Sequence, residues 1–321
     1  MPKVIIHDAV DPAARALLEA RENIKIVTIE RGERERLRLE LADADSIILR
    51  YLPLDADDLR AAANLKVVAR HGVGYDNIDM AAAEECGIPV ATIGDANSVT
   101  VAELALYLML AAAKQGLVFD AAVRGGNWWQ VREAAHTIEL YKKTVLVVGF
   151  GRIGSLVAPR CQAFGMDVRV CDPYISQATI SDAGFTPAPD IAAALQEADI
   201  VTLHTPLNDE TRHMIDAPAL AAMKQGALLV NTSRGPVVDD DALSAAIASG
   251  HLYAAGIDVF EEEPPAPESL LLGHANMVFT PHVGGLTREC FYRSAIVCAQ
   301  NSLDAIDGKL DSAFVVNPEV L

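Results

Sequence analysis

Three polar segments in the second half of the chain carry side chains that together could bind an anion and move a proton. They contain Arg234, the acidic run at 261–263 and His282. An arginine offers a planar fork that matches a carboxylate and can polarise a developing carbonyl. A histidine titrates near neutral pH, and a carboxylate paired with it orients the ring and keeps it protonated. Given a hydride acceptor, this set suits the oxidation of an alcohol next to a carboxylate.

A glycine-rich motif could hold such an acceptor. The apolar run at 144–148 (TVLVV) is typical of a strand buried on both faces, and the motif GFGRIG follows it directly. Gly149 allows the tight turn, Gly151 lets the backbone approach a pyrophosphate, and Gly154 lets the next helix pack closely. Asp172 stands 172 − 149 = 23 residues after the first glycine, where a carboxylate accepts ribose hydroxyls and repels a 2′-phosphate. The motif predicts dinucleotide binding, with NAD favoured over NADP.

Each of these residues also has a purely structural interpretation. Asp172 could cap the end of its strand, and Arg152 could face the pyrophosphate or, alternatively, a 2′-phosphate. Arg234 by itself is typical of a surface ion pair, a glutamate run before prolines is typical of a solvated loop, and His282 could satisfy loop backbone. All three segments follow predicted strands, at the edge where open α/β sheets bind ligands, and this shared placement favours catalysis.

The elements that must position these residues alternate between strands and helices. In the first part of the chain, apolar β-branched runs at 4–7, 24–29, 46–49 and 66–70 alternate with helical patterns at 12–21, 33–42 and 55–63. One long helix is predicted at 99–124, capped by Asn97 and Ser98, and another at 287–307. Six further strands are predicted between these helices, at 145–148, 167–171, 200–203, 227–231, 253–258 and 277–280. This order implies parallel sheets with helices on both faces.

Composition limits the partners. The chain has 321 residues, 51% of them hydrophobic, which fits about two globular domains. Its 26 basic and 44 acidic residues give a formal charge of −18, which argues against nucleic-acid binding and against anionic membrane surfaces. The start of the chain lacks a signal-peptide pattern, and the apolar stretch at 99–113 is too short to span a bilayer. Five cysteines without metal-ligand spacing predict reduced thiols, no metal site and a cytoplasmic protein.

Several motifs together resemble the D-isomer-specific 2-hydroxyacid dehydrogenases, a family that includes phosphoglycerate dehydrogenase, hydroxypyruvate and glyoxylate reductases and D-lactate dehydrogenase. The likeness extends over essentially the whole chain. The motifs are RHGVGYDNID at 70–79, SVTVAE at 98–103, VGFGRIG at 148–154, NTSRG at 231–235, GIDVF at 256–260 with Glu263-Pro264, and PHVGG at 281–285.

The resemblance implies a role for each matching residue. It makes Arg234 the anchor of the substrate carboxylate, Glu263 the orienting acid and His282 the acid/base, while Glu261 and Glu262 are expected to be solvated. It adds Arg50 and the backbone N–H groups of Val73 and Gly74 to the substrate site. The residues expected to bind the dinucleotide are Gly149, Gly151, Arg152, Ile153, Gly154, Asp172, Pro206, Thr232, Ser233, Asp258 and Gly285.

The resemblance also implies the architecture and the reaction. A smaller, flavodoxin-like substrate domain is expected from residues 1–97 and 289–321, and a larger Rossmann NAD-binding domain from residues 98–288. The implied reaction moves a hydride between NAD(H) and C2 of a small D-2-hydroxy or 2-keto acid, such as hydroxypyruvate, glyoxylate or a 3-phosphoglycerate-like acid. A homodimer formed through the cofactor domain is implied as well.

Some features depart from the family or leave alternatives open. Tyr51 follows Arg50, where phosphoglycerate-type members tend to have small hydroxyl or basic residues, and a glutamate at 263 disfavours formate dehydrogenase activity. Trp128 and Trp129 could cap a neighbouring active site in a dimer or simply pack at a helix end. Because some relatives are corepressors, an NAD(H)-sensing interaction protein is the alternative function.

Overall fold

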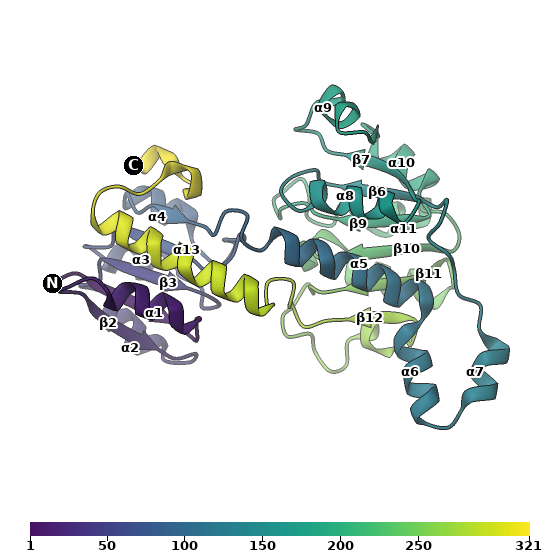
Figure 1. The fold of residues 1–321 in the computed structure, drawn as a ribbon, viewed down its shortest axis with the longest axis horizontal. Helices are drawn as coiled ribbons and strands as arrows, with labels where there is room; N and C mark the ends of the chain where they lie inside the picture. Colours follow the sequence, from purple (N-terminus) through teal and green to yellow (C-terminus); the bar gives the residue numbers. More distant parts are fainter. The chain divides into compact units, whose positions relative to one another are not determined.

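The chain divides into two compact units. The computed structural model describes all residues, 1–321, and separates unit 1 (Met1–Asn97 and Gly285–Leu321) from unit 2 (Ser98–Gly284). The chain passes from unit 1 to unit 2 between Asn97 and Ser98 and returns to unit 1 at Gly285. Each unit has its own parallel sheet (Figure 1).

Unit 1 contains a five-stranded parallel sheet in the order β2-β1-β3-β4-β5, which is the flavodoxin-like order. The strands are β1 (Lys3–His7), β2 (Lys25–Ile29), β3 (Ser46–Leu49), β4 (Val67–Arg70) and β5 (Val90–Ala91). The helices are α1 (Pro12–Glu19), α2 (Arg34–Leu41), α3 (Ala56–Ala61), α4 (Met80–Glu85) and α13 (Arg288–Ile306). The sequence analysis missed α4 and the short strand β5.

Alternate residues of the unit 1 strands face two separate cores. Ile5 and Ile47 pack with the helices α2, α3 and α4 on one face. Val4 and Ile48 pack with α1 and α13 on the other face. Because successive strand side chains point to opposite faces, an almost continuously apolar strand requires helices on both sides.

Unit 2 contains a seven-stranded parallel sheet in the order β12-β11-β10-β9-β6-β7-β8. The strands are β6 (Thr144–Val148), β7 (Asp167–Cys171), β8 (Thr186–Pro187), β9 (Ile200–Leu203), β10 (Ala227–Asn231), β11 (Leu252–Ile257) and β12 (Met277–Phe279). The chain runs outward from β6 to β8 and then returns to β9 on the other side of β6, so the strand order reverses there. Ligands of doubly wound sheets bind at such a reversal. The two predicted parallel α/β folds are thus confirmed, with β8 as an extra edge strand.

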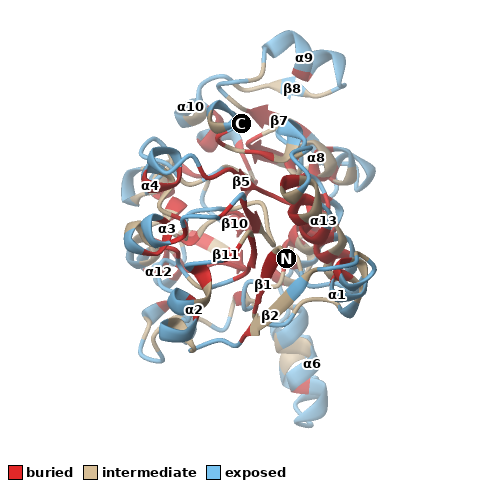
Figure 2. Ribbon diagram, turned by 90° about the vertical axis from the view of Figure 1, so that its left-hand side faces the viewer, coloured by how far each residue is buried: buried red, intermediate tan, exposed pale blue.

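Helices cover both faces of the unit 2 sheet. The central strand β10 is wholly buried, whereas the edge strand β8 is not (Figure 2). The helices α5 (Ser98–Lys114) and α8 (Gly154–Ala163) pack on one face. The helices α10 (Ile191–Glu197), α11 (Ala217–Ala222) and α12 (Asp240–Ala248) pack on the other. The short helix α9 (Gln177–Asp182) lies between β7 and β8 in the chain.

The prediction of one helix over 99–124 is wrong. The segment forms two helices, α5 and α6 (Gly116–Arg124), bent by 61° at Gln115, whose φ of 50° is left-handed. One face of α5 is buried along the length of the helix, whereas α6 buries only Ala122. The chain therefore leaves the sheet where the buried face of α5 ends. The predicted cap is also absent, because Asn97 Oδ1 and Ser98 Oγ have no hydrogen-bond partner.

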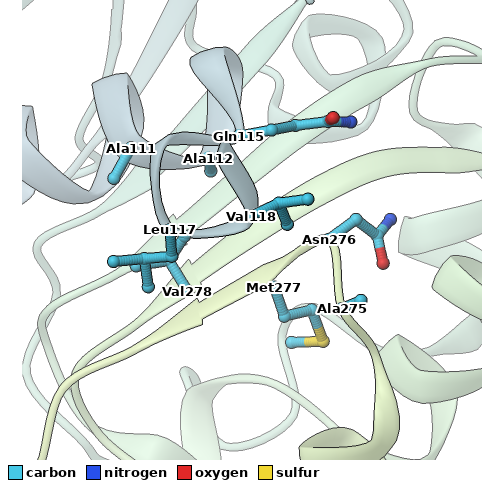
Figure 3. Close-up of a pocket in the computed structure, with 9 residues that line it drawn as sticks. All are labelled: Ala111, Ala112, Gln115, Leu117, Val118, Ala275, Asn276, Met277 and Val278. Atoms are coloured by element: carbon cyan, nitrogen blue, oxygen red, sulfur yellow. The ribbon is translucent and has the colours of Figure 1, made fainter. Parts of the chain in front are cut away.

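The junction between α5 and α6 lies over β12 and surrounds a small void (Figure 3). This void has a volume of about 10 Å³, is lined mainly by apolar side chains such as Leu117 and Val278, and has no titratable group on its wall. We therefore regard it as a packing defect rather than a ligand site.

No single helix has the length and apolarity needed to cross a membrane. Only the bent pair α5 and α6, taken together, meets that test of length and composition. Ten residues of α5 are buried within the protein.

Candidate active site

The glycine turn after β6 is closed at its ends and open in its middle. Gly149 has a φ of 91°, and a Cβ there would lie 2.6 Å from the carbonyl oxygen of His204. A Cβ at Gly154 would overlap the carbonyl oxygen of Gly149, whereas one at Gly151 would meet nothing within 4 Å. Only the middle of the turn therefore leaves room for a ligand to approach the backbone. The first N–H groups of α8 lie directly behind it, and a helix N-terminus favours phosphate.

Asp172 has the structural role considered for it. Its Oδ2 accepts a hydrogen bond from the Phe150 N–H at 2.7 Å, and its Oδ1 accepts one from the Tyr174 N–H at 2.8 Å. The carboxylate thus caps backbone groups of the glycine turn and of its own loop. Each carboxylate oxygen can accept more than one hydrogen bond, so the group retains capacity for ribose hydroxyls.

The segment after β10 is ordered by Asn231. The side-chain oxygen of Asn231 accepts hydrogen bonds from the N–H and Oγ of Ser233, and its Nδ2 donates to the carbonyl of Arg234 at 2.9 Å. Next to them, Thr232 Oγ1 is buried and has no hydrogen-bond partner. Buried hydroxyls are nearly always hydrogen-bonded, so this atom is suited to meet a bound cofactor.

Asp258 anchors the segment that carries His282. Its carboxylate accepts hydrogen bonds from Thr280 Oγ1 at 2.6 Å, from the Val283 N–H at 2.9 Å and from the Gly284 N–H at 3.0 Å. Its backbone carbonyl accepts the His282 N–H at 2.8 Å. Burial raises the pKa of Asp258, although these hydrogen bonds act against that rise. The turn after β12 is therefore fixed to the end of β11.

The side chains of His282 and Glu263 meet directly. His282 Nδ1 lies 2.7 Å from Glu263 Oε2, and Glu263 Oε1 accepts the Phe260 N–H at 3.1 Å. Burial alone would raise the pKa of Glu263, but the hydrogen bond and charge of His282, together with the charge of Arg234, hold that pKa below its usual value. The carboxylate is thus ionised at neutral pH. The structure brings the three predicted catalytic side chains near enough for the charges of His282 and Arg234 to act on Glu263.

Glu261 and Glu262 are both exposed, as expected, but Glu261 also has partners. Its Oε1 contacts His213 Nε2, and its N–H donates to Asp240 Oδ2 at 3.3 Å. Burial raises the pKa of Asp240 to about 6, and the charges of Glu261 and of the neighbouring aspartates contribute to the rise. The sequence analysis missed His213 and Asp240, because each lies far along the chain from the acidic run.

The remaining predicted cofactor residues lie in loops or at a helix start. Arg152 and Ile153 precede α8, and Arg152 is exposed. Pro206 is exposed after β9, and its carbonyl accepts a hydrogen bond from Thr211. Gly285 is the first residue of the second segment of unit 1. No group of three or more His, Cys, Asp or Glu side chains is arranged to hold a metal ion.

Three predicted substrate residues lie in unit 1, at the carboxyl ends of its strands. Arg50 follows β3, and Val73 and Gly74 follow β4. The buried guanidinium of Arg50 donates to the hydroxyl of Tyr51 at 2.6 Å, and its carbon lies 4.5 Å from the centre of the Tyr51 ring and 5.1 Å from that of Phe291.

Beside Arg50 lies a histidine that the sequence analysis missed. The ring of His71 packs against Phe291, with ring centres 5.4 Å apart. Burial lowers the pKa of His71 to about 4, and the charge of Arg50 adds to that effect. The imidazole is therefore neutral near pH 7.

Comparisons with known proteins match both units. Residues 106–284 match the family model described as "D-isomer specific 2-hydroxyacid dehydrogenase, NAD binding domain". The chain is 38% identical over 322 residues to D-3-phosphoglycerate dehydrogenase of Methanocaldococcus jannaschii, covering all of this chain but only 60% of that protein. It is 38% identical over 297 residues to hydroxypyruvate reductase of Thermotoga maritima, covering 92% of this chain and 95% of that one. The crystal structure of the TT0316 protein from Thermus thermophilus is similar with a TM-score of 0.89 at 33% identity, covering 98% and 99% of the two chains.

The raised pKa of Asp240 predicts that this carboxylate destabilises the fold at neutral pH. With a pKa near 3.8 when unfolded and about 6 when folded, the folded state holds the extra proton between these values, so the Asp240 contribution to stability falls as pH rises from about 4 to 6. Asp240→Asn keeps an acceptor oxygen for the Glu261 N–H and removes the charge. We expect it to raise the free energy of unfolding by about 1–3 kcal/mol above pH 7 and to leave it unchanged below pH 4.

Urea unfolding at a series of pH values measures this difference. Asp241→Asn, which changes the exposed neighbour on α12, is the matched control and should change stability by no more than about 0.5 kcal/mol. Equal stability of Asp240→Asn and the wild type at pH 8 would contradict the prediction.

Proposed function

The chain belongs to the D-isomer-specific 2-hydroxyacid dehydrogenase family, and we propose that it is an oxidoreductase that transfers a hydride between NAD(H) and C2 of a small D-2-hydroxy or 2-keto acid. The observation that carries the proposal is the His282–Glu263 pair, held at 2.7 Å within reach of the charge of Arg234. Candidate substrates are hydroxypyruvate, glyoxylate and 3-phosphoglycerate-like acids, since the relatives named above act on acids of this class.

Each catalytic side chain has one task in the proposed reduction. Arg234 binds the substrate carboxylate and polarises the neighbouring carbonyl. Glu263 stays ionised and holds His282 through Nδ1, so that the opposite nitrogen, Nε2, faces the substrate with its proton. A bound nicotinamide would supply the hydride to C2, and His282 would donate that proton to the carbonyl oxygen. In the oxidative direction, neutral His282 accepts the hydroxyl proton at the same atom.

The cofactor is proposed to lie along the carboxyl edge of the unit 2 sheet. This unit carries the NAD-binding domain of the family. The open turn at Gly151 and the start of α8 suit the pyrophosphate, and Asp172 suits the ribose hydroxyls. The unpartnered Thr232 hydroxyl supports a place for this residue in the cofactor site. The other residues that we propose to line the site are Gly149, Arg152, Ile153, Gly154, Pro206, Ser233, Asp258 and Gly285.

Unit 1 is proposed to be the substrate domain. In this proposal Arg50 and the backbone N–H groups of Val73 and Gly74 help to bind the substrate carboxylate. The presence of Arg234, Glu263 and His282 favours catalysis over the alternative of an NAD(H)-sensing interaction protein. We further propose a cytoplasmic homodimer without nucleic-acid or membrane partners, in line with the net charge of −18.

Loss of His282 should abolish most of the turnover. We expect His282→Ala to lower kcat by about 10²–10⁴-fold, because a positioned proton donor contributes that much to a rate. His282 has a φ of 51°, so His282→Asn is the better-matched variant, since asparagine tolerates a left-handed backbone. The assay follows NADH absorbance with a panel of 2-keto acids, and the exposed His136→Ala should keep wild-type rates. Wild-type kcat in His282→Asn would refute the role of this residue, and NADH binding without turnover in the wild type would favour the sensing function.

Asp172 should determine the choice between NAD and NADP. Removing its charge in Asp172→Ala relieves the repulsion of a 2′-phosphate, so the preference for NADH over NADPH should fall at least about tenfold. Asp172→Asn removes the charge but keeps an acceptor for the Phe150 and Tyr174 N–H groups. The measurement is the ratio of kcat/KM for NADH and NADPH. An unchanged ratio in both variants would show that discrimination lies elsewhere.

The helices α6 and α7 (Trp128–Ala134) support the dimer proposal. They form an arm beyond the unit 2 sheet (Figure 1), and between them lies a recess of about 250 Å³ lined by Phe119 and Trp128. Trp129 is 69% exposed, and Val123 is 54% exposed. Monomeric proteins rarely expose so much large apolar side chain in one place.

Sedimentation equilibrium tests this proposal. We expect the wild-type chain to sediment at twice the chain mass and Trp129→Glu to shift it toward the monomer. Leu270→Glu, at another exposed apolar position of unit 2, should stay dimeric. A monomeric wild type at every concentration would contradict the homodimer.

A further inference from the structure

Two histidines of unit 2 share a left-handed backbone conformation and a glutamate partner. Six non-glycine residues of the chain have positive φ, and His213 (φ 50°) and His282 (φ 51°) are two of them. The two rings contact two glutamates of one loop, the loop after β11. His282 pairs with Glu263, and His213 pairs with Glu261. A left-handed backbone is uncommon for a residue with a side chain, and it is retained where the surroundings require it.

His213 connects the two loops that carry the proposed catalytic residues. Its backbone N–H donates to the carbonyl of Pro236 at 2.8 Å, two residues after Arg234. Its ring Nε2 contacts Oε1 of Glu261, two residues before Glu263. The backbone contact thus reaches the loop after β10, and the ring contact reaches the loop after β11.

The two loops are also in tight contact with each other. A Cβ at Gly235 would overlap the carbonyl of Phe260, so their backbones touch directly. The loop after β10 has further support, since the Ile215 N–H donates to the Val237 carbonyl at 3.1 Å. In the segment before Glu263, Phe260 is buried and its N–H donates to Glu263 Oε1 at 3.1 Å. Glu261, which follows Phe260, is held by the 3.3 Å hydrogen bond from its N–H to Asp240 and by its contact with His213.

The charges around this contact are mostly negative. Asp239, Asp240 and Asp241 begin α12 beside the loop, and Glu262 follows Glu261. In such surroundings an unpaired Glu261 side chain would be repelled from its position. The ring of His213 holds it there, although the pair is partly exposed and contributes little to global stability.

We propose that His213 is a positioning residue for the reaction, acting through Glu261 to hold Glu263 against His282. The inference rests on the proposed function. Losing the Glu261 side chain frees the segment that carries Glu263, so the imidazole loses its orientation while the glycine turn and Asp172 stay unchanged. The expected effect is therefore on kcat and not on the KM for NADH.

The experiment compares two adjacent glutamates of equal charge. Glu261→Ala should lower kcat roughly 5- to 50-fold, since small misplacements of catalytic groups cost up to about 10²-fold. Glu261→Gln, which can still accept a hydrogen bond from His213, should recover most of that loss. The matched control is Glu262→Ala, which removes the exposed neighbour and should keep wild-type kcat and KM.

His213, the partner of Glu261, is tested in the same way. His213→Asn preserves the left-handed backbone and removes the ring, and it should match Glu261→Ala. The double variant His213→Asn/Glu261→Ala should lose no more than the worse single variant, because both remove one contact. Thermal unfolding of all variants is expected to stay close to the wild type. If Glu261→Ala fails to fold, the comparison of Glu261→Gln with His213→Asn still tests whether His213 positions Glu263 through Glu261.

A readout without turnover separates this inference from the proposed function. The Nδ1 proton of His282 gives a downfield NMR signal while it is held in the hydrogen bond to Glu263, and this signal should be lost or broadened in Glu261→Ala and His213→Asn but kept in Glu262→Ala. A retained signal together with wild-type kcat in both variants would overturn the role of His213. If the wild type turns over no keto acid but both variants lose the signal, the positioning role is supported and only the proposed reaction is refuted.

Discussion

The site depends on the parallel pairing of β10, β11 and β12. In this register Asn231 lies beside Ile257, and Ile257 lies beside Phe279, so the three strands end at one edge of the sheet. Parallel strands bring all their carboxyl ends together, and the loops that leave them are necessarily neighbours. Arg234, Glu263 and His282 come from three such loops. A slip of one residue in any strand would turn its side chains to the opposite face and would separate these groups.

Within this frame, hydrogen bonds to carboxylates fix the loops. Asp258 holds the turn after β12, Glu263 holds the His282 ring, and Asp172 holds the glycine turn. Each carboxylate has at least two hydrogen-bond partners, and at least one of them is a backbone N–H, so a single side chain orders a loop. At Asp240, burial and neighbouring negative charges outweigh the hydrogen bond from the Glu261 N–H and raise the pKa to about 6. The carboxylates of this acidic chain are thus stabilised individually, each by nearby hydrogen-bond donors.

Much of this arrangement follows from sequence patterns, and the exceptions have physical reasons. Strand alternation and the spacing of the glycines predict the parallel sheets and the edge at which polar residues gather. The pairing of His213 with Glu261 was not predictable, because it joins residues 48 positions apart through the shapes of two loops. The bend at Gln115 was missed because the helical pattern continues through it, and the helix breaks where its packing surface on the sheet ends. Asp240 reads as an ordinary first-turn acid of a helix, and only tertiary burial shifts its titration.

Unit 1 is assembled from two segments that are distant in the chain. The face of its sheet formed by Val4 and Ile48 is covered by α1 and by α13, whose Ala295 and Cys298 complete the same core. During synthesis the first strands of unit 1 leave the ribosome early, but their second covering helix arrives only after all of unit 2. The continuous unit 2 can close its core first, since domains generally fold as units. One face of the unit 1 sheet therefore stays partly uncovered until α13 has been synthesised.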